Sequence, residues 1–336
     1  MKLLHIADRK PHERIWVPDF ARAVRELGDL EIIENGGAMA EGDLVSRIQD
    51  AEVLLTDWGS APVPLAIAKA PGRLRYICCV TGTIRRIIPV EIIEAGIPVT
   101  NWGDATSREV AEAALTLLLA TVKNLPGRIR IIREGGWDIP DDFRSGVMEL
   151  MTVGVYGCGS IARRFIDMLR PLGPKVLVFD PYARSLPEGV TRVNSLEELF
   201  SRSDAVAIHA GLTPETTGSV TAKHLAMLRD GGVLINTARG EIVDQDALLR
   251  EVESGRLRAG IDVLRRRRGS PADLPPEHPA RQWDSLILTA HCLSNPSPWP
   301  QTLQAMHRVC LDNLRRYIAG EPLRFAMDRA RYELST

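Results

Sequence analysis

The feature that most constrains the fold of this chain is the pattern of residues between Val153 and Asp180. A short apolar run at 152–156 leads into Gly157-Cys158-Gly159-Ser160-Ile161-Ala162 and then into a helical stretch. A second apolar run, 175–179, ends at Asp180. A strand, a glycine turn, a helix and a second strand that ends in an acid form the arrangement that binds a dinucleotide.

Each residue of this turn suits that task. Gly157 permits the tight turn, and Gly159 lets the backbone approach a pyrophosphate. Ser160 and Ile161 open the helix, whose N-terminus attracts negative charge, and Ala162 lets the helix pack close to the sheet. Glycine turns between a strand and a helix also occur in α/β proteins without a ligand, but the two flanking strands favour the dinucleotide site.

Asp180 predicts which dinucleotide is bound. It lies 21 residues after Gly159, near the spacing of about 20 residues for an acid that binds the ribose. A carboxylate here accepts hydrogen bonds from ribose hydroxyls and repels a 2′-phosphate. The sequence therefore predicts NAD as the cofactor in preference to NADP.

Short apolar runs and helical segments alternate along the whole chain, which predicts an α/β fold with parallel, doubly wound sheets. With 336 residues the chain is long enough for two domains. The expected strands cover 3–7, 31–33, 53–56, 76–80, 152–156, 175–179, 205–209, 233–236 and 258–263, and the expected helices cover 20–27, 44–48, 90–94, 109–123 and 301–319.

Composition narrows the class of partner and the location. The formal net charge is −1, so neither nucleic acid nor an anionic membrane is an expected partner. No run of 18 apolar residues occurs, and a membrane span is therefore not expected. The five cysteines have no C-x-x-C spacing, which favours a reducing, cytoplasmic location and predicts neither a disulfide framework nor a metal site.

Three charged or titratable residues follow later strands. Arg239 follows the run at 233–236, Asp262 lies at the end of the run at 258–263, and His291 comes after a third run. Ligands bind at the carboxyl ends of the strands in a doubly wound sheet. An arginine there can hold a carboxylate with two hydrogen bonds, and a histidine can transfer a proton near neutral pH. Singly, each also fits a structural role, but together with NAD they suit oxidation of a hydroxyl group beside a carboxylate.

With these motifs in this order, the chain resembles the D-isomer-specific 2-hydroxyacid dehydrogenase family, which includes 3-phosphoglycerate, glyoxylate/hydroxypyruvate and formate dehydrogenases. The matching stretches lie between Ile97 and His291. Beside the glycine turn and Asp180 they are Val110-Ala111-Glu112, Leu212-Thr213-Pro214-Glu215-Thr216-Thr217-Gly218, Asn236-Thr237-Ala238-Arg239-Gly240, Ile261-Asp262-Val263 and Leu288-Thr289-Ala290-His291. As an ordered set they are highly specific.

The resemblance implies a domain organisation. An NAD-binding domain, residues 101–296, is inserted into a discontinuous substrate domain formed by residues 1–100 and 297–336. Most members of the family are homodimers, so a homodimer is expected here.

The resemblance also implies roles for single residues. Arg239 would bind the substrate carboxylate and polarise the carbonyl, and His291 would donate the proton in reduction and accept it in oxidation. Asp180 would hold the adenosine ribose, and Asp262 would lie near the nicotinamide. The further cofactor contacts that it implies are Ala210, Thr237 and Ala238.

The chain departs from the family at the residue that pairs with the histidine. In the family, a glutamate five residues after the Asp262 position forms this pair and raises the pKa of the histidine, which then carries a proton. Counting five residues leads to Arg267, which has the opposite charge. Alignment from the other end of the segment places Ala272 at the glutamate position with Asp273 beside it. We favour this second alignment, in which Asp273 takes the role of the glutamate.

A second departure lies in the turn Thr81-Gly82-Thr83, where relatives hold the substrate carboxylate with backbone amides. The family's turn ends in Asp-Asn, but here Arg85 and Arg86 replace this acidic ending. These arginines either face solvent or bind a second anionic group of the substrate. The resemblance thus predicts a small anionic substrate held by Thr81, Gly82, Thr83 and Arg239, but it does not name that substrate.

Three functions are compatible with these features. The first is an NAD-dependent 2-hydroxyacid dehydrogenase, or 2-oxoacid reductase, which the presence of Arg239 and His291 favours. The second is a hydride transfer like that of formate dehydrogenase, in which no substrate proton moves. The third is a non-catalytic NAD(H)-binding sensor or corepressor-like protein. The missing glutamate is the main support for the second and third.

Overall fold

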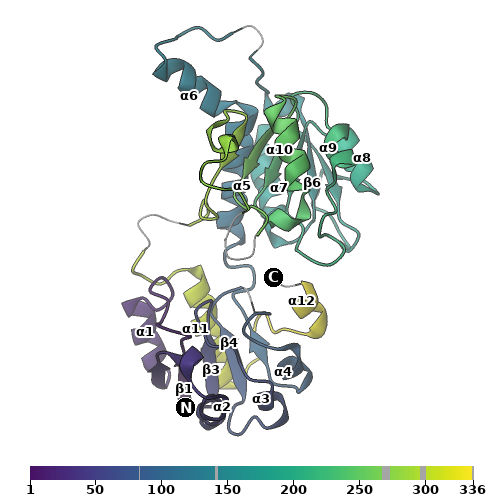
Figure 1. Cartoon of the computed structure of the whole chain (residues 1–336). Helices are drawn as coiled ribbons and strands as arrows, with labels where there is room; N and C mark the ends of the chain where they lie inside the picture. The colour runs from purple at the N-terminus through teal and green to yellow at the C-terminus, as the bar shows by residue number, and fades with distance from the viewer. Residues whose placement is uncertain (83, 141–142, 267–272, 296–299, 335–336) are drawn as a thin grey trace. The chain divides into compact units, whose positions relative to one another are not determined.

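The computed structural model describes all residues except 83, 141–142, 267–272, 296–299 and 335–336 (Figure 1). The chain divides into two compact units, one formed by Met1–Thr106 with Pro296–Thr336 and the other by Ser107–Asn295. Each unit consists of a parallel sheet covered by helices on both faces. The predicted α/β class with two doubly wound domains is therefore confirmed.

The first unit contains a five-stranded parallel sheet with the order β2-β1-β3-β4-β5. Its strands are β1 (Lys2–Ile6), β2 (Asp29–Ile33), β3 (Val53–Thr56), β4 (Tyr76–Cys79) and β5 (Val99–Thr100). Its helices are α1 (Pro18–Arg25), α2 (Glu41–Asp50), α3 (Ala66–Lys69), α4 (Val90–Glu94), α11 (Ala305–Ala319) and α12 (Arg329–Leu334).

Side-chain alternation along β1 and β3 divides the core of this unit between the two faces of the sheet. Leu3 and Val53 pack with residues of α1 and α11 on one face. Leu4 and Leu54 pack with residues of α2, α3 and α4 on the other. The apolar runs of these strands are buried on both faces, as is typical of parallel sheets.

The last long helix begins later than the sequence predicts. The prediction placed its start at residue 301, but α11 starts at Ala305. Gln304 and His307 form a capping box, in which each side chain bonds the backbone amide of the other residue. Such reciprocal bonds fix the first turn of a helix and define where it begins.

The second unit contains a seven-stranded parallel sheet with the order β12-β11-β10-β9-β6-β7-β8. Its strands are β6 (Thr152–Tyr156), β7 (Lys175–Phe179), β8 (Thr191–Arg192), β9 (Ala205–Ile208), β10 (Val233–Asn236), β11 (Arg258–Ile261) and β12 (Leu286–Leu288). Its helices are α5 (Ser107–Val122), α6 (Leu125–Arg133), α7 (Ser160–Leu169), α8 (Leu196–Ser201), α9 (Ala222–Met227) and α10 (Gln245–Glu253).

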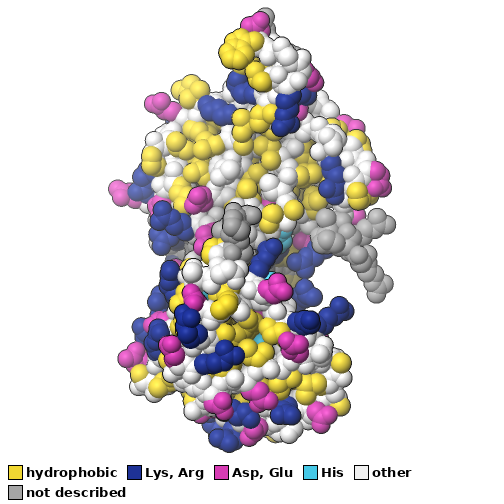
Figure 2. All heavy atoms as spheres, turned by 90° about the vertical axis from the view of Figure 1, so that its left-hand side faces the viewer, with side chains coloured by type: hydrophobic (Ala, Val, Ile, Leu, Met, Phe, Trp, Pro, Cys, Tyr) yellow, Lys and Arg dark blue, Asp and Glu magenta, His cyan; other side chains and the backbone are white. Residues whose placement is uncertain are grey.

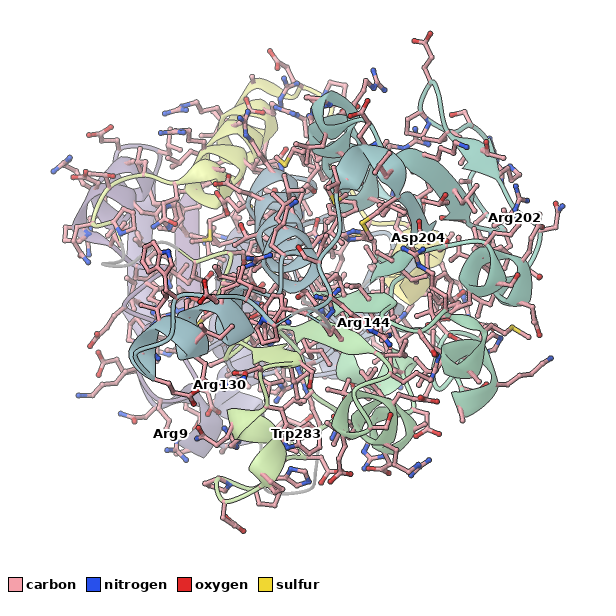
Figure 3. The ribbon with its side chains drawn as sticks, turned by 90° about the horizontal axis from the view of Figure 1, so that it is seen from above. Arg9, Arg130, Arg144, Arg202, Asp204 and Trp283 are labelled. Carbon is pink, nitrogen blue, oxygen red and sulfur yellow. The ribbon has the colours of Figure 1, made fainter. Side chains whose placement is uncertain are left out.

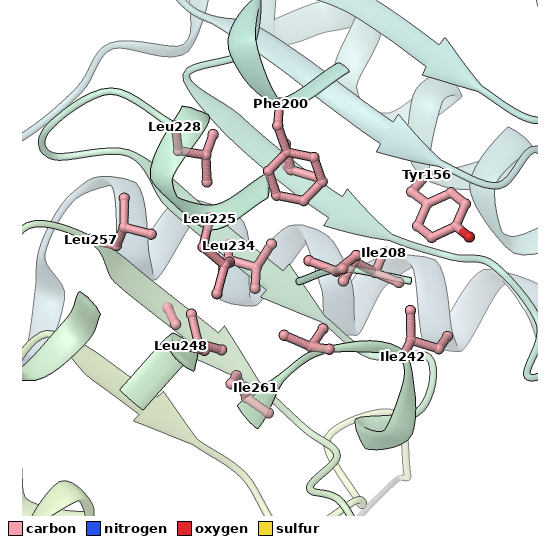
Figure 4. Packing of buried hydrophobic residues seen from close by; sticks show 14 of the residues in the cluster. Tyr156, Phe200, Ile208, Leu225, Leu228, Leu234, Ile242, Leu248, Leu257 and Ile261 are labelled. Carbon is pink, nitrogen blue, oxygen red and sulfur yellow. The ribbon is translucent and has the colours of Figure 1, made fainter. Parts of the chain in front are cut away.

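Two apolar clusters lie on the two faces of this sheet. Residues of α5 and α7 pack with Val153 and Val155 on one face. Residues of α8, α9 and α10 form the other cluster, part of which Figure 4 shows around Phe200 and Leu234. The strand order reverses between β6 and β9, and the carboxyl ends of strands at such a reversal are where ligands of doubly wound sheets bind.

Helix α6 was not predicted from the sequence. In Figure 1 it projects from the body of its unit, and its apolar side chains Leu125, Ile129 and Ile132 are 45%, 40% and 54% exposed. Arg130 of α6 forms an ion pair with Asp284, the residue after Trp283, and Figure 3 labels Arg130 and Trp283. In the part of the chain that the structure describes, no helix is long and apolar enough to cross a membrane.

Candidate active site

The glycine turn sits at the point where the strand order of the second sheet reverses. Gly157 has a φ of +91°, and a Cβ atom there would lie 2.6 Å from the backbone nitrogen of Ala210, at the end of β9. Only glycine fits this position. A Cβ at Gly159 would meet no atom within 4 Å, so the backbone is open to a ligand there. Helix α7 starts at the next residue, Ser160, whose hydroxyl accepts a 2.9 Å bond from Ser107.

Asp180 fastens the glycine turn to the end of β7. Its Oδ2 accepts a 2.6 Å hydrogen bond from the amide of Cys158. Its Oδ1 accepts bonds of 2.7 Å and 2.9 Å from the amides of Tyr182 and Ala183. A carboxylate has about four acceptor positions, so one remains for a ribose hydroxyl. Asp180 therefore has a structural task in addition to the predicted cofactor contact.

Two arginines near Asp180 are bound to backbone carbonyls. Arg192 donates to the carbonyl oxygens of Asp180 and Ala183 at 2.9 Å and 2.6 Å. Arg163 of α7 donates to the carbonyl of Ser185 at 2.5 Å. These bonds hold the two guanidinium groups against the backbone beside Asp180.

Arg239 lies just after β10 on a turn that Asn236 closes. The side chain of Asn236 accepts from the amide of Ala238 at 3.0 Å and donates to the carbonyl of Arg239 at 2.9 Å. Arg239 is partly buried, and burial together with the charge of Arg266 lowers its pKa. The hydroxyl of Thr237 is buried and has no hydrogen-bond partner among the described residues. It is therefore available to a bound cofactor.

Asp262 organises the segment that carries His291. Asp262 is 6% exposed, and its Oδ1 accepts bonds from the hydroxyl of Thr289 and from the amides of Cys292 and Leu293. The segment after β12 thus wraps around one carboxylate oxygen. His291 lies within this wrap and has a φ of +54°, which is uncommon for a residue other than glycine. This position fits both a structural role for Asp262 and one beside the candidate site.

The electrostatic surroundings of His291 favour its neutral form. Partial burial, followed by the charges of Arg239 and Arg266, lowers the pKa of His291, and the charge of Asp262 opposes this shift. The same interactions show that Arg239, Asp262 and His291, which follow the adjacent strands β10, β11 and β12, lie close to one another.

Asp273 does not pair with His291, contrary to the alignment that we favoured. Its carboxylate accepts bonds of 2.9 Å and 2.5 Å from Arg265, and its amide donates to the carbonyl of Arg265 at 2.7 Å. Among the described residues, no carboxylate forms an ion pair with His291. Arg267 and Ala272, the other residues that the two alignments placed at the glutamate position, lie outside the described residues.

The predicted substrate turn lies in the first unit, at the carboxyl end of β4. Thr81 is buried, Gly82 is partly buried, and Thr83 lies outside the described residues. The side chain of Asn101 donates to the carbonyl of Gly82 at 3.0 Å and so fixes the turn. The two arginines after the turn are both exposed.

Arg85 is bound by the C-terminal segment of the chain. Its Nε donates to the carbonyl of Tyr332 at 2.9 Å, and its guanidinium lies 5.9 Å from the centre of the Tyr332 ring. A second substrate anion would have to compete with these contacts. The interpretation of Arg85 as an anion-binding residue is therefore weakened, and only Arg86 keeps it without such competition.

Two residues near the site were missed from the sequence. Ser107 starts α5 and bonds Ser160, which brings the first turn of α5 to that of α7. Arg266 lies in a run of arginines, and its charge acts on both Arg239 and His291. Neither residue belongs to a sequence motif, because the contribution of each depends on how two separate segments of the chain meet.

The arrangement suits hydride transfer at a group that also carries a negative charge. The open backbone at Gly159, the start of α7 and the unpartnered Thr237 hydroxyl fit a dinucleotide. An arginine and a histidine lie at neighbouring strand ends of the same sheet. The described residues contain no cluster of His, Cys, Asp and Glu that could hold a metal ion.

Comparisons with known proteins agree with this geometry. The family model for the NAD binding domain of D-isomer specific 2-hydroxyacid dehydrogenases matches residues 115–292, more than half of the chain. A D-3-phosphoglycerate dehydrogenase of Methanocaldococcus jannaschii is 27% identical over 309 residues, which are 90% of this chain but only 56% of that protein. This chain thus spans little more than half the length of that relative. A hydroxypyruvate reductase of Blautia hydrogenotrophica is 26% identical over 310 residues, 90% of this chain and 93% of that protein.

A solved structure shares the fold. D-lactate dehydrogenase with NAD+ from Lactobacillus jensenii superimposes with a TM-score of 0.77 at 21% identity, over 98% of this chain and 100% of that one. The chain therefore belongs to the D-isomer specific 2-hydroxyacid dehydrogenases, a family of NAD-dependent oxidoreductases that act on the CH–OH group of their donors.

Proposed function

We propose that this protein reduces a small 2-oxo acid to the 2-hydroxy acid, or catalyses the reverse oxidation, with NAD(H). The observation that carries the proposal is the convergence of Arg239, Asp262 and His291 at the ends of adjacent strands in the sheet that carries the glycine turn. When bound, NADH supplies the hydride that reduces the carbonyl carbon. The adenosine and pyrophosphate end would be held by Gly157, Gly159, Ser160, Ile161, Ala162 and Asp180. The remainder of the cofactor would lie along Ala210, Thr237, Ala238 and Asp262.

Arg239 binds the substrate in this proposal. Its planar guanidinium can donate two parallel hydrogen bonds to a carboxylate, which fixes the orientation of the adjacent carbonyl. Its partial burial strengthens such an interaction. The family resemblance also assigns the turn at Thr81, Gly82 and Thr83 to the substrate carboxylate.

His291 transfers the proton. In reduction, the protonated imidazole donates its proton to the carbonyl oxygen as the carbon accepts the hydride, and in oxidation the neutral ring accepts the proton from the hydroxyl. The neighbouring cations Arg239 and Arg266 hold the pKa of His291 below its ordinary value. A bound carboxylate would offset the charge of Arg239 and so raise that pKa. Substrate binding itself therefore favours the protonated donor.

A reaction without proton transfer is the second candidate. It is favoured by one observation, which is that no described carboxylate pairs with His291 while two cations lower its pKa. A formate-dehydrogenase-like hydride transfer does not need the protonated ring. An NAD(H)-binding sensor would not need it either, and it would bind NADH without turnover.

Steady-state assays of the full-length protein with NADH and a panel of 2-oxo acids separate these functions. We expect turnover of at least one 2-oxo acid, and none of formate with NAD+. Formate oxidation would support the second candidate. Tight NADH binding in a fluorescence titration, with no turnover of any acid, would support the sensor.

A homodimer joined through α6 is also part of this proposal. Leu125, Ile129 and Ile132 of α6 are exposed, as are Trp137 and Leu150 in the segment that follows it, at 85% and 82%. Exposed apolar side chains gathered on one element often mark a protein interface. Figure 2 shows hydrophobic side chains at the top of the molecule, where α6 lies, with Lys and Arg among them. Ile129→Glu with Ile132→Glu should shift the mass in light scattering from dimer to monomer. A wild-type monomer would contradict the proposal.

The five cysteines, none of which forms a disulfide in the structure, agree with the cytoplasmic location proposed from their number.

A further inference from the structure

Three aromatic rings meet at the carboxyl-end edge of the first unit's sheet. Trp58 follows β3, Trp102 follows β5, and His12 lies on the loop after β1. The rings of Trp58 and Trp102 stand edge to face, with centres 5.4 Å apart and planes at 90°. The ring of His12 also lies near Trp58, with centres 6.0 Å apart and planes at 67°. We call these three residues the aromatic edge.

The central ring of the aromatic edge is held in place but left open. Trp58 is 45% exposed. Asp57, directly before it, is fully buried and accepts bonds from Trp16 Nε1 at 2.8 Å and from the amide of Gly59 at 2.7 Å. These bonds fix the turn that presents Trp58. An exposed indole on a rigid turn is a surface that an apolar group can cover at low entropic cost.

The aromatic edge adjoins the turn that we propose for the substrate carboxylate. A Cβ atom at Gly82 would lie 2.3 Å from Nε1 of Trp102, so the indole rests directly on this glycine. Asn101, the residue before Trp102, bonds the carbonyl of Gly82 at 3.0 Å. A 2-oxo acid whose carboxylate lies at Gly82 therefore has its side chain within reach of Trp102 and Trp58.

We propose that the aromatic edge is the binding surface for the substrate's side chain, and that the substrate class is 2-oxo acids with an aromatic side chain. This inference rests on the proposed function. An aromatic ring would add a third edge-to-face or stacked contact to the Trp58–Trp102 pair, whereas a hydrogen or methyl group would leave Trp58 uncovered.

Charge disfavours the other side-chain classes. Cationic groups also bind over indole rings, but both carboxylate oxygens of the adjacent Asp57 accept internal bonds, and the loop that carries His12 has three cations, Arg9, Lys10 and Arg14, against Asp8 and Glu13. Anionic side chains would need Arg85 or Arg86, and the Tyr332 carbonyl already engages Arg85. A neutral aromatic group meets neither obstacle.

The test compares 2-oxo acids that share the reacting group and differ in the side chain. In NADH-coupled assays, kcat/KM for phenylpyruvate should exceed that for pyruvate and glyoxylate by at least roughly tenfold. Trp58→Ala should lower kcat/KM for phenylpyruvate roughly tenfold or more, and by a larger factor than it lowers kcat/KM for pyruvate. Trp58→Phe should retain most of the preference. Leu65→Ala, which removes another exposed apolar side chain of the same unit (54% exposed), should change neither value.

Three results would overturn the inference while leaving the proposed function intact. They are a wild-type preference for pyruvate or glyoxylate, a preference for 2-oxoglutarate or a guanidino 2-oxo acid, and an equal loss with all substrates in Trp58→Ala. If no 2-oxo acid is reduced, the proposed function fails, and calorimetric titration of phenyllactate into the NADH complex still decides the inference. Binding that Trp58→Ala abolishes and Leu65→Ala retains supports the aromatic edge. No binding to the wild type rejects it.

Discussion

The two sheets of this protein carry their candidate functional residues at the same kind of edge, but the sequence reveals much more of one edge than of the other. In the seven-stranded sheet, the glycine turn, Asp180, Arg239 and His291 each belong to a motif that follows a strand. In the five-stranded sheet, the loops after β3 and β5 hold Trp58 and Trp102, which belong to no motif. Backbone that binds an invariant dinucleotide needs particular residues at particular spacings. Side chains that contact a variable substrate group need only the right chemistry, so no fixed spacing in the sequence identifies them.

The largest expected effect tests whether Arg239, at the edge of the seven-stranded sheet, binds the substrate carboxylate. Arg239→Lys keeps the charge but removes the planar pair of donors, so kcat/KM for the best 2-oxo acid should fall on the order of 10²-fold or more. NADH affinity, measured by fluorescence titration, should stay near that of the wild type. Arg250→Lys, an exposed arginine of α10, is the matched control. Unchanged turnover in Arg239→Lys would move the grip to an arginine of the first unit, such as Arg86.

The next largest effect tests whether Asp180 makes the protein prefer NADH over NADPH. We expect NADH to be preferred over NADPH by at least roughly tenfold, about 1.4 kcal/mol, because a 2′-phosphate would meet the Asp180 carboxylate. Asp180→Ser should narrow the ratio of the two kcat/KM values. It should also weaken NADH binding, because the carboxylate fastens the Cys158 amide. Equal use of both cofactors by the wild type would refute the role of Asp180, and the exposed Arg184 would then be the first residue to test.

How much of the molecule could be predicted follows the same division. Long apolar runs such as β6 and β7 were placed within the observed bounds, because burial on both faces of a parallel sheet demands them. β5 has two residues and α6 exposes its apolar face, so neither shows the expected pattern. In the candidate site, Arg239, Asp262 and His291 follow strands that are adjacent in the sheet, and a doubly wound sheet makes such neighbours expected. The pairing of Asp273 with Arg265 could not be predicted from the sequence, because it depends on the path of a loop that has no periodic pattern.

A smaller effect concerns Arg266, whose contribution to the site has no motif. Its charge helps to lower the pKa of His291, so the protonated donor is lost as pH rises through a value below the ordinary one. Arg266→Ala should raise that pKa and move the falling limb of the reduction profile to higher pH. At pH 7 the rate of reduction should rise about two- to threefold.

The pH profile of kcat/KM under reducing conditions measures this change, with Arg250→Lys again as the control. If the falling limb of this pH profile does not move in Arg266→Ala, Arg266 does not act on His291 in solution. A limb that moves to lower pH would mean that Arg266 supports the protonated ring through a contact with the substrate.

The smallest expected effect is the one that separates the sequence alignment from the structure. If Asp273 replaced the family glutamate, Asp273→Asn would lower the pKa of His291, move the falling limb to lower pH and slow reduction at neutral pH. In the structure, Asp273 pairs with Arg265 instead, on a partly exposed surface. Asp273→Asn should therefore leave the limb in place and kcat/KM within about twofold, with a loss of stability of at most about 1 kcal/mol in urea unfolding. Arg267→Glu provides the counterpart, because it tests the first alignment directly. A shift caused by Asp273→Asn would restore it as the partner of His291, whereas a rate increase in Arg267→Glu alone would assign the glutamate position to residue 267.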